Sequence, residues 1–350
     1  MNKWVREDLK SYEPYNASAQ PFPIVLDANE SPWGLTETVR DNVAAWFANA
    51  ENLNRYPDTN STELREVLAS LWGLSRENIV CGVGSDQLIE YITKALLMPG
   101  DTLVTMTPSF SMYKLTAKLN HGRVEEFPLN ADYTLDADGF IRFAKAHNAK
   151  LVILCTPNNP TGGSIPEADL LRIAAALDCP VVVDEAYAEF GQDTVIPHIG
   201  MYDNLLVLRT FSKAYGLAGA RIGYAVAQKE LADALHIVRA PYNLPTLSQR
   251  LAIEVLRDME AYKERIETLR SYKDELFEKL SGLEEIHVFP SDANFIYIET
   301  ERNISESLER HGIHARVFLR GEKEKVRLSC GTPLENEAAI QAIRESVIGG

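Results

Sequence analysis

The sequence has no uninterrupted apolar run long enough to cross a lipid bilayer, and residues 1–8 contain no apolar core like that of a signal peptide. A membrane protein and a secreted protein are therefore not expected, and we predict a cytoplasmic location. Cysteine is also scarce, and its four copies lie far apart without a C-x-x-C pair. We expect free, buried thiols in a reducing compartment, with little support for a catalytic cysteine, at Cys81, Cys155, Cys179 and Cys330.

Positive charge is in short supply, since 35 Lys and Arg are set against 50 Asp and Glu, for a formal net charge of −15. This charge argues against nucleic acid or an anionic membrane as a partner. The seven histidines suggest no metal site. His311 and His314 lie close together in the sequence, but Gly312 between them predicts a surface turn. The sequence also lacks repeats and low-complexity segments.

From about residue 60 to 230, helical patterns alternate with short apolar runs. Helices are expected at 62–72 and 85–97, and strands at 103–106, 151–155, 181–183 and 205–208. The last three strands are nearly continuous in Val, Leu and Ile, which is typical of strands covered by helices on both faces. We therefore predict an α/β domain with a mainly parallel sheet, whose ligand binds beyond the carboxyl ends of the strands.

The alternation of helical patterns and short apolar runs ends at the segment N-L-P, residues 243–245. The pattern beyond it predicts a long amphipathic helix at 246–280, strands at 294–298, 314–318 and 326–329, and a terminal helix from about residue 335. We predict a large domain at 31–245 and a smaller α+β domain at 246–350. The latter is grouped with an N-terminal arm, residues 1–30, which precedes the α/β unit and could pack on it.

Lys213 stands in the segment T-F-S-K-A-Y-G-L-A-G-A-R-I-G-Y, between small residues that suit a side chain aimed at a ligand. A single lysine is usually a solvated surface residue. Upstream, the run V-V-V-D-E-A-Y places Asp184 at the end of an apolar strand, where an unpaired carboxylate is costly to bury unless it begins a helix. An amine nucleophile with an acidic partner and a phosphate clamp are the parts that hold pyridoxal phosphate (PLP) as a Schiff base.

Further residues supply the other parts of such a site. Asn159 follows a strand in the turn P-N-N-P-T-G, and its amide, like the Tyr187 hydroxyl, suits the O3′ oxygen of the cofactor ring. The turn G-V-G-S-D leads into a helix, whose N-terminus binds anions unless Ser85 is an ordinary N-cap. Ser212 and Arg221 would complete the phosphate clamp, so that local donors act against the acidic charge of the whole chain.

Several longer segments resemble one known family over essentially the full length of the chain. They are L-D-A-N-E-S-P-W-G (Leu26 to Gly34), L-N-R-Y-P-D (Leu53 to Asp58), P-N-N-P-T-G, V-D-E-A-Y-A-E-F (Val183 to Phe190), R-T-F-S-K-A-Y-G-L-A-G-A-R-I-G (Arg209 to Gly223) and V-R-L-S-C-G-T (Val326 to Thr332). The lysine and D-E-A-Y segments are similar to the fold-type I PLP-dependent aminotransferase superfamily. The L-D-A-N-E, N-R-Y-P and V-D-E-A-Y-A-E-F segments resemble the histidinol-phosphate aminotransferase family.

The resemblance implies a role for individual residues. Lys213 would form the Schiff base, Asp184 would pair with the pyridine nitrogen, and Tyr187 with Asn159 would bond O3′. Phe110 would stack on the ring. The phosphate would be surrounded by Gly84, Ser85, Asp86, Ser212 and Arg221. Tyr56 would reach the phosphate bound by the other subunit, which implies a homodimer with a shared active site. The implied substrate-binding residues are Tyr15, Asn29, Tyr56, Asn159, Arg320 and Arg327, although Arg320 by itself reads as a solvated surface charge.

The chain departs from the family pattern at a few positions. Phe110 stands where tyrosine is common, so that a hydroxyl is lost while stacking is kept. Ser329 and Cys330 replace the usual Thr and Ile or Val, Gln87 replaces a frequent acidic residue, and Val83 stands where asparagine is common. These changes remove no catalytic group, but they bear on substrate preference.

The resemblance implies transamination between histidinol phosphate and 2-oxoglutarate, giving imidazole-acetol phosphate and glutamate, in histidine biosynthesis. One alternative is an aminotransferase that acts mainly on aromatic amino acids, since pocket contacts separate related ligands by only a few kcal/mol. Another is a PLP lyase similar to threonine-phosphate decarboxylase. A PLP-binding regulator would call for an added DNA-binding domain, and the enzyme pattern begins within the first thirty residues.

Overall fold

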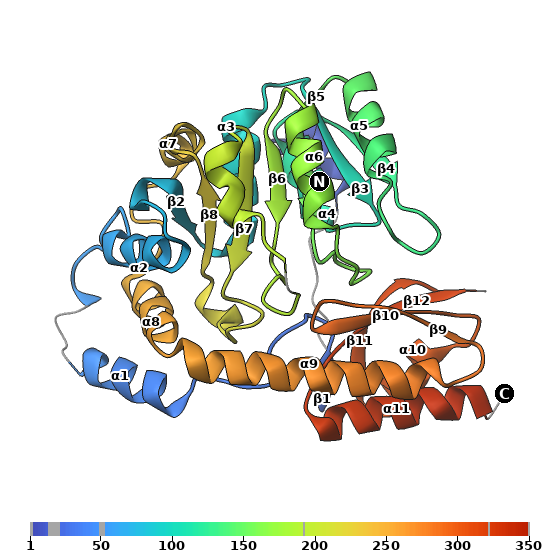
Figure 1. The fold of residues 1–350 in the computed structure, drawn as a ribbon. Coiled ribbons are helices and arrows are strands. Elements are labelled where there is room, and N and C mark those ends of the chain that lie inside the picture. Colours follow the sequence, from blue (N-terminus) through green and yellow to red (C-terminus); the bar gives the residue numbers. More distant parts are fainter. Residues whose placement is uncertain (1–2, 13–21, 49–52, 192, 321–322, 349–350) are drawn as a thin grey trace.

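The computed structural model describes residues 3–12, 22–48, 53–191, 193–320 and 323–348. Its larger part is built on a seven-stranded sheet with the order β2-β8-β7-β6-β5-β3-β4 (Figure 1). The strands are β2 (Ile79–Gly82), β3 (Thr102–Thr107), β4 (Arg123–Pro128), β5 (Ala149–Cys155), β6 (Val181–Asp184), β7 (Leu205–Thr210) and β8 (Gly223–Ala227). The neighbours from β7 to β4 are parallel, whereas β8 is antiparallel to both β7 and β2.

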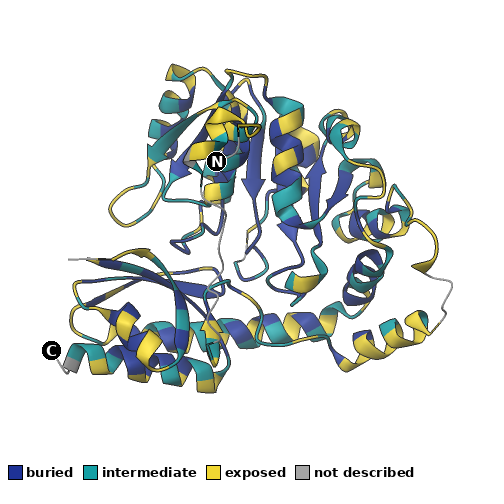
Figure 2. Cartoon of the chain, turned by 180° about the vertical axis from the view of Figure 1, so that it is seen from behind, coloured by how far each residue is buried: buried dark blue, intermediate teal, exposed yellow. Residues whose placement is uncertain are grey.

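Helices cover this sheet, and its strands other than the edge strand β4 are largely buried (Figure 2). The helices are α2 (Thr62–Trp72), α3 (Gly84–Leu96), α4 (Ser111–Leu119), α5 (Ala137–Ala146), α6 (Glu167–Ala176) and α7 (Lys229–Val238). Every residue of β6 and β7 is buried, as their continuous Val and Leu runs predict. The predicted α/β fold with a mainly parallel sheet is confirmed.

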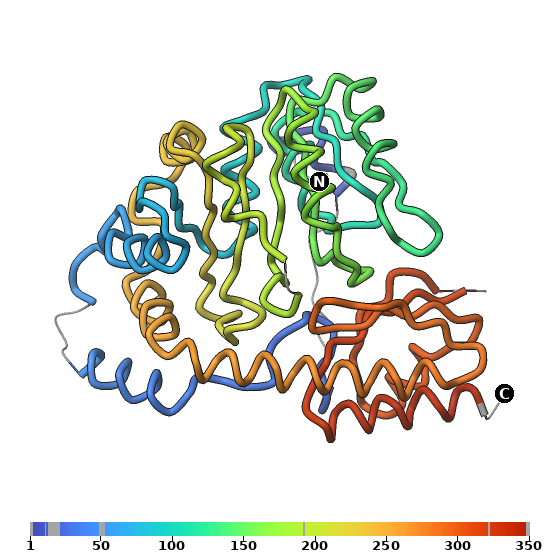
Figure 3. The backbone as a smooth tube through the Cα atoms, in the orientation of Figure 1, coloured from blue at the N-terminus to red at the C-terminus, as the bar shows by residue number. Residues whose placement is uncertain are grey.

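A second sheet has five strands in the order β1-β11-β12-β10-β9. They are β1 (Ile24–Leu26), β9 (Ile286–Phe289), β10 (Phe295–Thr300), β11 (Ile313–Leu319) and β12 (Glu324–Ser329). Its separate apolar core includes residues of α9 (Met259–Ser281), α10 (Ile304–Arg310) and α11 (Pro333–Ile348). Figure 3 shows α9 running along both parts of the chain. These helices lie on the side of the second sheet away from the large sheet (Figure 1).

Each of the two sheets draws its strands from one of the two predicted domains. All strands of the large sheet fall within residues 31–245, and all strands of the small sheet fall within 1–30 or 246–350. The N-terminal arm touches both parts, because β1 pairs with β11 while the Arg6 guanidinium donates to the Leu119 carbonyl at 3.4 Å. A boundary at residue 245 is our proposal for the division of the chain.

One expectation from the sequence needs correction. The helical pattern at 246–280 is two helices, α8 (Thr246–Arg257) and α9, because Asp258 leaves the helical conformation and accepts a hydrogen bond of 2.6 Å from the Thr36 hydroxyl. Helix α8 packs on α2 and on α1 (Glu37–Phe47). The turn predicted between the two histidines falls at His311 and Gly312, and His314 lies in β11, as the strand predicted at 314–318 requires. The His314 ring stacks on Phe22 at 4.9 Å between centroids.

Two other expectations concern the cysteines and the membrane. All four cysteines are buried and free, as predicted. Over the ranges that the structure describes, no helix combines the length and the apolarity needed to cross a membrane.

Candidate active site

The functional side chains gather where neighbouring strands of the large sheet end. Asp184 is the last residue of β6, Asn159 follows β5 and Lys213 follows β7. Because β6 pairs in parallel with both β5 and β7, their carboxyl ends meet at one edge of the sheet. Residues that are distant in the sequence therefore share one site.

Asp184 is buried, with 3% of its surface exposed. Its carboxylate accepts hydrogen bonds from the Tyr113 hydroxyl at 2.6 Å and from the Ala186 N–H at 3.1 Å, in a turn and not at a helix N-terminus. Across the described part of the chain, it forms no ion pair with a basic side chain. Burial raises the pKa of Asp184 to about 6, against the lowering effect of the two donors. Its contribution to stability is thus complete below the unfolded pKa and is lost as the pH rises through about 6.

A buried carboxylate in this state favours a cationic ligand. A protonated pyridine nitrogen supplies one positive charge and one N–H donor, which match the acidic group. Asp184 therefore fits the pyridine end of PLP.

The Lys213 amine lies between the N-terminal segment and Tyr187. Its Nζ atom donates to the Ala28 carbonyl at 2.6 Å and lies 5.9 Å from the centroid of the Tyr187 ring. The surrounding protein lowers the pKa of Lys213 to about 8, chiefly through loss of solvation and then through the positive charge of Arg327. An amine with a lowered pKa has a larger unprotonated fraction near neutral pH, which is the nucleophilic form.

The N-terminus of α3 forms an anion cradle with Arg221. Val83 is the N-cap residue and provides no side-chain hydrogen bond, so that Ser85 lies in the first turn and is not the N-cap. The Arg221 guanidinium bonds Asp86 at 2.9 Å and Ser212 at 3.4 Å. Backbone N–H groups at a helix N-terminus together with a guanidinium suit a phosphate.

Two glycines permit this close arrangement. Gly84 has φ +75°, and a Cβ atom there would lie 2.6 Å from Nη2 of Arg221. A Cβ atom at Gly223 would lie 2.6 Å from the backbone of both Gly84 and Ser85. Space next to the helix N-terminus is therefore kept open by the absence of side chains.

Gly223→Ala is expected to lower the melting temperature of the cofactor-free protein and to weaken PLP binding. The added methyl group meets backbone atoms of α3, and overpacking of this kind costs about 1–3 kcal/mol. Thermal unfolding and equilibrium dialysis with PLP measure the two effects. Gly219→Ala is the matched control, because a Cβ atom at Gly219 meets nothing within 4 Å. Equal behaviour of the two variants would contradict the steric argument.

Residues from the small sheet complete the group on its other side. Arg327 of β12 donates to the Asn159 side chain and to the Asp27 carbonyl. Asn29, fully buried with φ +54°, donates to the Tyr187 hydroxyl at 3.0 Å and bonds Ser329 of β12. These contacts connect the N-terminal segment and the small sheet with the cofactor-side residues.

Three further residues predicted for the site are Phe110, Tyr56 and Tyr15. Phe110 precedes α4, with its ring edge-to-face on Tyr113 at 5.5 Å between centroids. Tyr56 is 80% exposed and stacks on Tyr242. Tyr15 lies outside the described residues.

The structure does not bring Arg320 beside Arg327, and it brings Arg316 there instead. Arg320 follows the end of β11 and forms an exposed ion pair of 2.7 Å with Glu309 of α10. Arg316 is the register partner of Arg327 in the antiparallel pair of β11 and β12, so that both side chains leave the same face of the sheet. Both guanidinium groups also lie within 6 Å of the Phe318 ring, at 5.9 and 5.8 Å from its centroid.

Sequence reasoning therefore missed Arg316, and it also missed Tyr113. A pattern signal existed for each of them. Tyr113 lies one helical turn after Phe110, which favours packing on the same side. Arg316 belongs to a predicted strand, but its facing partner depends on the strand register.

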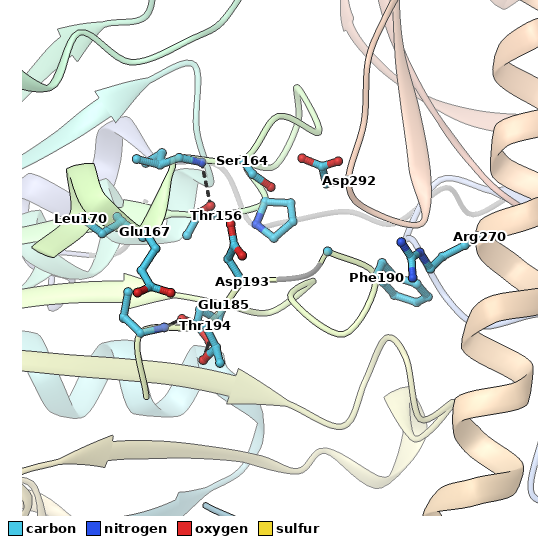
Figure 4. Close-up of a pocket in the computed structure, with 14 residues that line it drawn as sticks. Thr156, Ser164, Glu167, Leu170, Glu185, Phe190, Asp193, Thr194, Arg270 and Asp292 are labelled. Carbon is cyan, nitrogen blue, oxygen red and sulfur yellow. Dashed lines mark hydrogen bonds between the residues drawn. The ribbon is translucent and has the colours of Figure 1, made fainter. Parts of the chain in front are cut away.

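A cavity of about 250 Å³ lies beside Glu185 of the D-E-A-Y segment, between the large domain and α9 (Figure 4). Arg270 reaches it from α9, and Glu185 lines it from the large domain. Glu185 accepts hydrogen bonds from Thr194 at 2.7 Å and from the Val195 N–H at 2.9 Å, and it forms a buried ion pair with Arg209 at 2.7 Å. Glu185 is thus held by an ion pair, whereas the adjacent Asp184 has no basic partner among the described residues.

Fold and site together define the class of this protein as a PLP-dependent enzyme of fold type I. A family model for aminotransferase class I and II matches residues 12–343. The chain is 40% identical over 346 residues to a histidinol-phosphate aminotransferase of Ruminiclostridium cellulolyticum, with 97% of each chain covered. It is 38% identical over 345 residues to that of Caldanaerobacter subterraneus, covering 97% of this chain and 98% of the relative.

A solved structure agrees with these sequence relationships. The crystal structure of histidinol-phosphate aminotransferase from Sinorhizobium meliloti, in complex with pyridoxal-5′-phosphate, has a TM-score of 0.89 at 25% identity and covers 100% of this chain and 99% of its own. The chain belongs to the histidinol-phosphate aminotransferase family. The resemblance inferred from the motifs and the assignment as an aminotransferase are confirmed.

Proposed function

We propose that this protein transfers the amino group of histidinol phosphate to 2-oxoglutarate, giving imidazole-acetol phosphate and glutamate, as a step of histidine biosynthesis. The observation that carries the proposal is the position of Lys213. Its amine, with a pKa lowered to about 8, donates to the Ala28 carbonyl, lies 5.9 Å from the centroid of the Tyr187 ring and feels the positive charge of Arg327. The names of the full-length relatives support the choice of substrates.

PLP, when bound, would supply the electron sink for cleavage of the C–H bond at the Cα atom, the substrate carbon that carries the amino group. Lys213 Nζ, as a free amine, would take the proton from Cα and return it to the accepting carbon. Asp184 would keep the pyridine nitrogen protonated, while Asn159 and Tyr187 would hold O3′. Burial raises the pKa of Tyr187 to about 12, so its hydroxyl stays protonated and can donate.

Arg327 and Arg316 would bind the anionic end of each substrate. One substrate carries a phosphate monoester and the other a side-chain carboxylate, and a guanidinium group offers paired donors to both oxyanions. Two like charges on one face of a sheet repel each other, so that an anion between them is stabilising. We therefore propose Arg316 for the role that the resemblance implies for Arg320.

We also propose a homodimer in the cytoplasm. Tyr56 and Tyr242 expose 80% and 46% of their surfaces although their rings stack at 4.5 Å between centroids. Exposed aromatic pairs of this kind are enriched where another protein surface covers them. A second copy would cover these rings, and Tyr56 would then reach the phosphate of the partner's cofactor.

The test uses purified protein reconstituted with PLP, histidinol phosphate and 2-oxoglutarate, and it measures the glutamate formed. We expect kcat/KM for histidinol phosphate to exceed that for phenylalanine by on the order of 10², since only the phosphate substrate can occupy the guanidinium groups fully. Preference for phenylalanine would instead indicate an aromatic aminotransferase. Release of carbon dioxide from threonine phosphate without glutamate would indicate a lyase.

A further inference from the structure

Tyr113 of α4 is a buried residue that contacts Asp184 and has no role in the proposed reaction. Its side chain has no exposed surface, and its hydroxyl donates to Oδ2 of Asp184 at 2.6 Å. Its ring lies edge-to-face against Phe110. The tyrosine thus contacts Asp184 from within the protein core and from a different element, since Asp184 belongs to β6.

The hydrogen bond has a clear electrostatic consequence. Burial favours the neutral acid form of Asp184, and the negative charges of Asp86 and Glu185 act in the same direction. The only groups that oppose them by hydrogen bonding, among the described residues, are Tyr113 and the Ala186 N–H. The Cys155 thiol is also close, but burial raises its pKa to about 12, so it carries no charge at neutral pH. Among the described residues, Tyr113 is therefore the side chain whose hydrogen bond stabilises the carboxylate, beside the backbone N–H of Ala186.

We propose that Tyr113 is a positioning residue that acts through Asp184: its hydroxyl fixes Oδ2 and keeps the carboxylate charged and oriented for the protonated pyridine nitrogen. This inference rests on PLP as the cofactor and does not depend on which amino acid is the substrate. The hydroxyl occupies one lone pair of Oδ2, and the Ala186 N–H holds Oδ1 from the other side. With both oxygens held, the carboxylate cannot rotate away from the ring.

Tyr113→Phe removes only the hydroxyl and keeps the ring against Phe110. We expect the affinity for PLP to fall about tenfold, because one charge-assisted hydrogen bond to the cofactor's partner is lost. The pyridine nitrogen then holds its proton less firmly. The pyridine ring then carries less positive charge, so the nitrogen that links Lys213 to the cofactor keeps its own proton to a higher pH. The midpoint of the pH titration of the visible absorbance should therefore move upward. The kcat value should fall while KM changes little.

Tyr224→Phe is the matched control, since Tyr224 is also buried and its hydroxyl accepts from the Trp72 indole N–H at 3.3 Å, away from Asp184. It should leave PLP affinity and the absorbance midpoint unchanged. A double-mutant cycle compares the PLP affinities of the wild type, Tyr113→Phe, Asp184→Asn and the double variant, each measured by dialysis. Strongly non-additive losses are expected if Tyr113 acts through Asp184.

Two results would overturn the proposal. One is a Tyr113→Phe protein with a lowered melting temperature but with wild-type PLP affinity and absorbance midpoint, because that outcome describes packing alone. The other is additive losses in the cycle. Neither result bears on the choice of histidinol phosphate as substrate, which the glutamate assay tests separately.

Discussion

Lys213→Ala should lower turnover by a factor of about 10⁴ or more and abolish the visible absorbance of the PLP-loaded protein. The variant loses both the covalent attachment of the cofactor and the amine that moves the proton, and each contribution is large. The positive charges of Arg327 and Arg221, which act on the pKa of Lys213, belong to guanidinium groups and cannot replace its amine. The measurements are steady-state glutamate formation and an absorbance spectrum after reconstitution.

A surface lysine provides the control for this variant. Lys229→Ala removes an exposed amine that is paired with Asp233, and it should leave turnover and the spectrum unchanged. Borohydride treatment of the wild-type protein should label a peptide containing position 213. A label on another lysine, or turnover in Lys213→Ala within tenfold of wild type, would refute the assignment.

Arg327→Ala is expected to lower kcat/KM for histidinol phosphate by on the order of 10², through a loss of about 3 kcal/mol of charge-assisted hydrogen bonding. PLP affinity should change much less, because the phosphate cradle lies at α3 and Arg221, on the large domain. The Arg327 guanidinium also holds the Asn159 side chain, so a modest fall in kcat is expected too. Steady-state kinetics and PLP dialysis separate the two effects.

Variants of the neighbouring arginines test the geometry of the small sheet. Arg316→Ala should raise KM for the phosphate substrate, because its guanidinium shares a face with that of Arg327. Arg320→Ala should leave KM unchanged, because Arg320 is paired with Glu309 at the surface. A large effect of Arg320→Ala with none from Arg316→Ala would reverse this assignment. Equal losses of substrate and PLP binding in Arg327→Ala would contradict the role of Arg327.

Much of the large domain could be predicted because its signals are local. The bounds of α2 match the predicted helix, and the apolar runs of β5, β6 and β7 mark strands that are buried on both faces. The break between α8 and α9 at Asp258 was not predictable, since neither proline nor glycine marks it and the contact that favours it comes from Thr36. The sequence pattern does not predict the pairing of β1 with β11 either, because the partners, such as Ile24 and Ile313, lie near opposite ends of the chain.

The common location of the proposed cofactor residues could be predicted for a related reason. Asp184 ends β6, while Asn159 follows β5 and Lys213 follows β7, and the parallel pairing of these strands brings the three residues to one edge of the sheet. Tyr113 and Arg316 were missed because their roles depend on which side chains face them. The hydroxyl of Tyr113 matters only through its contact with Asp184, and Arg316 only through its register with Arg327.

The amino-acid sequence alone determined which chemical groups the protein carries, the α/β class and the family. These properties depend on residue type and on patterns that span a few residues, where propensity and periodicity act. Only the tertiary structure decided the state of those groups: the raised pKa of Asp184, the lowered pKa of Lys213 and the choice of Arg316 over Arg320 beside Arg327. Loss of solvation and the identity of a facing partner arise when segments distant in the chain pack together, and no local pattern encodes them.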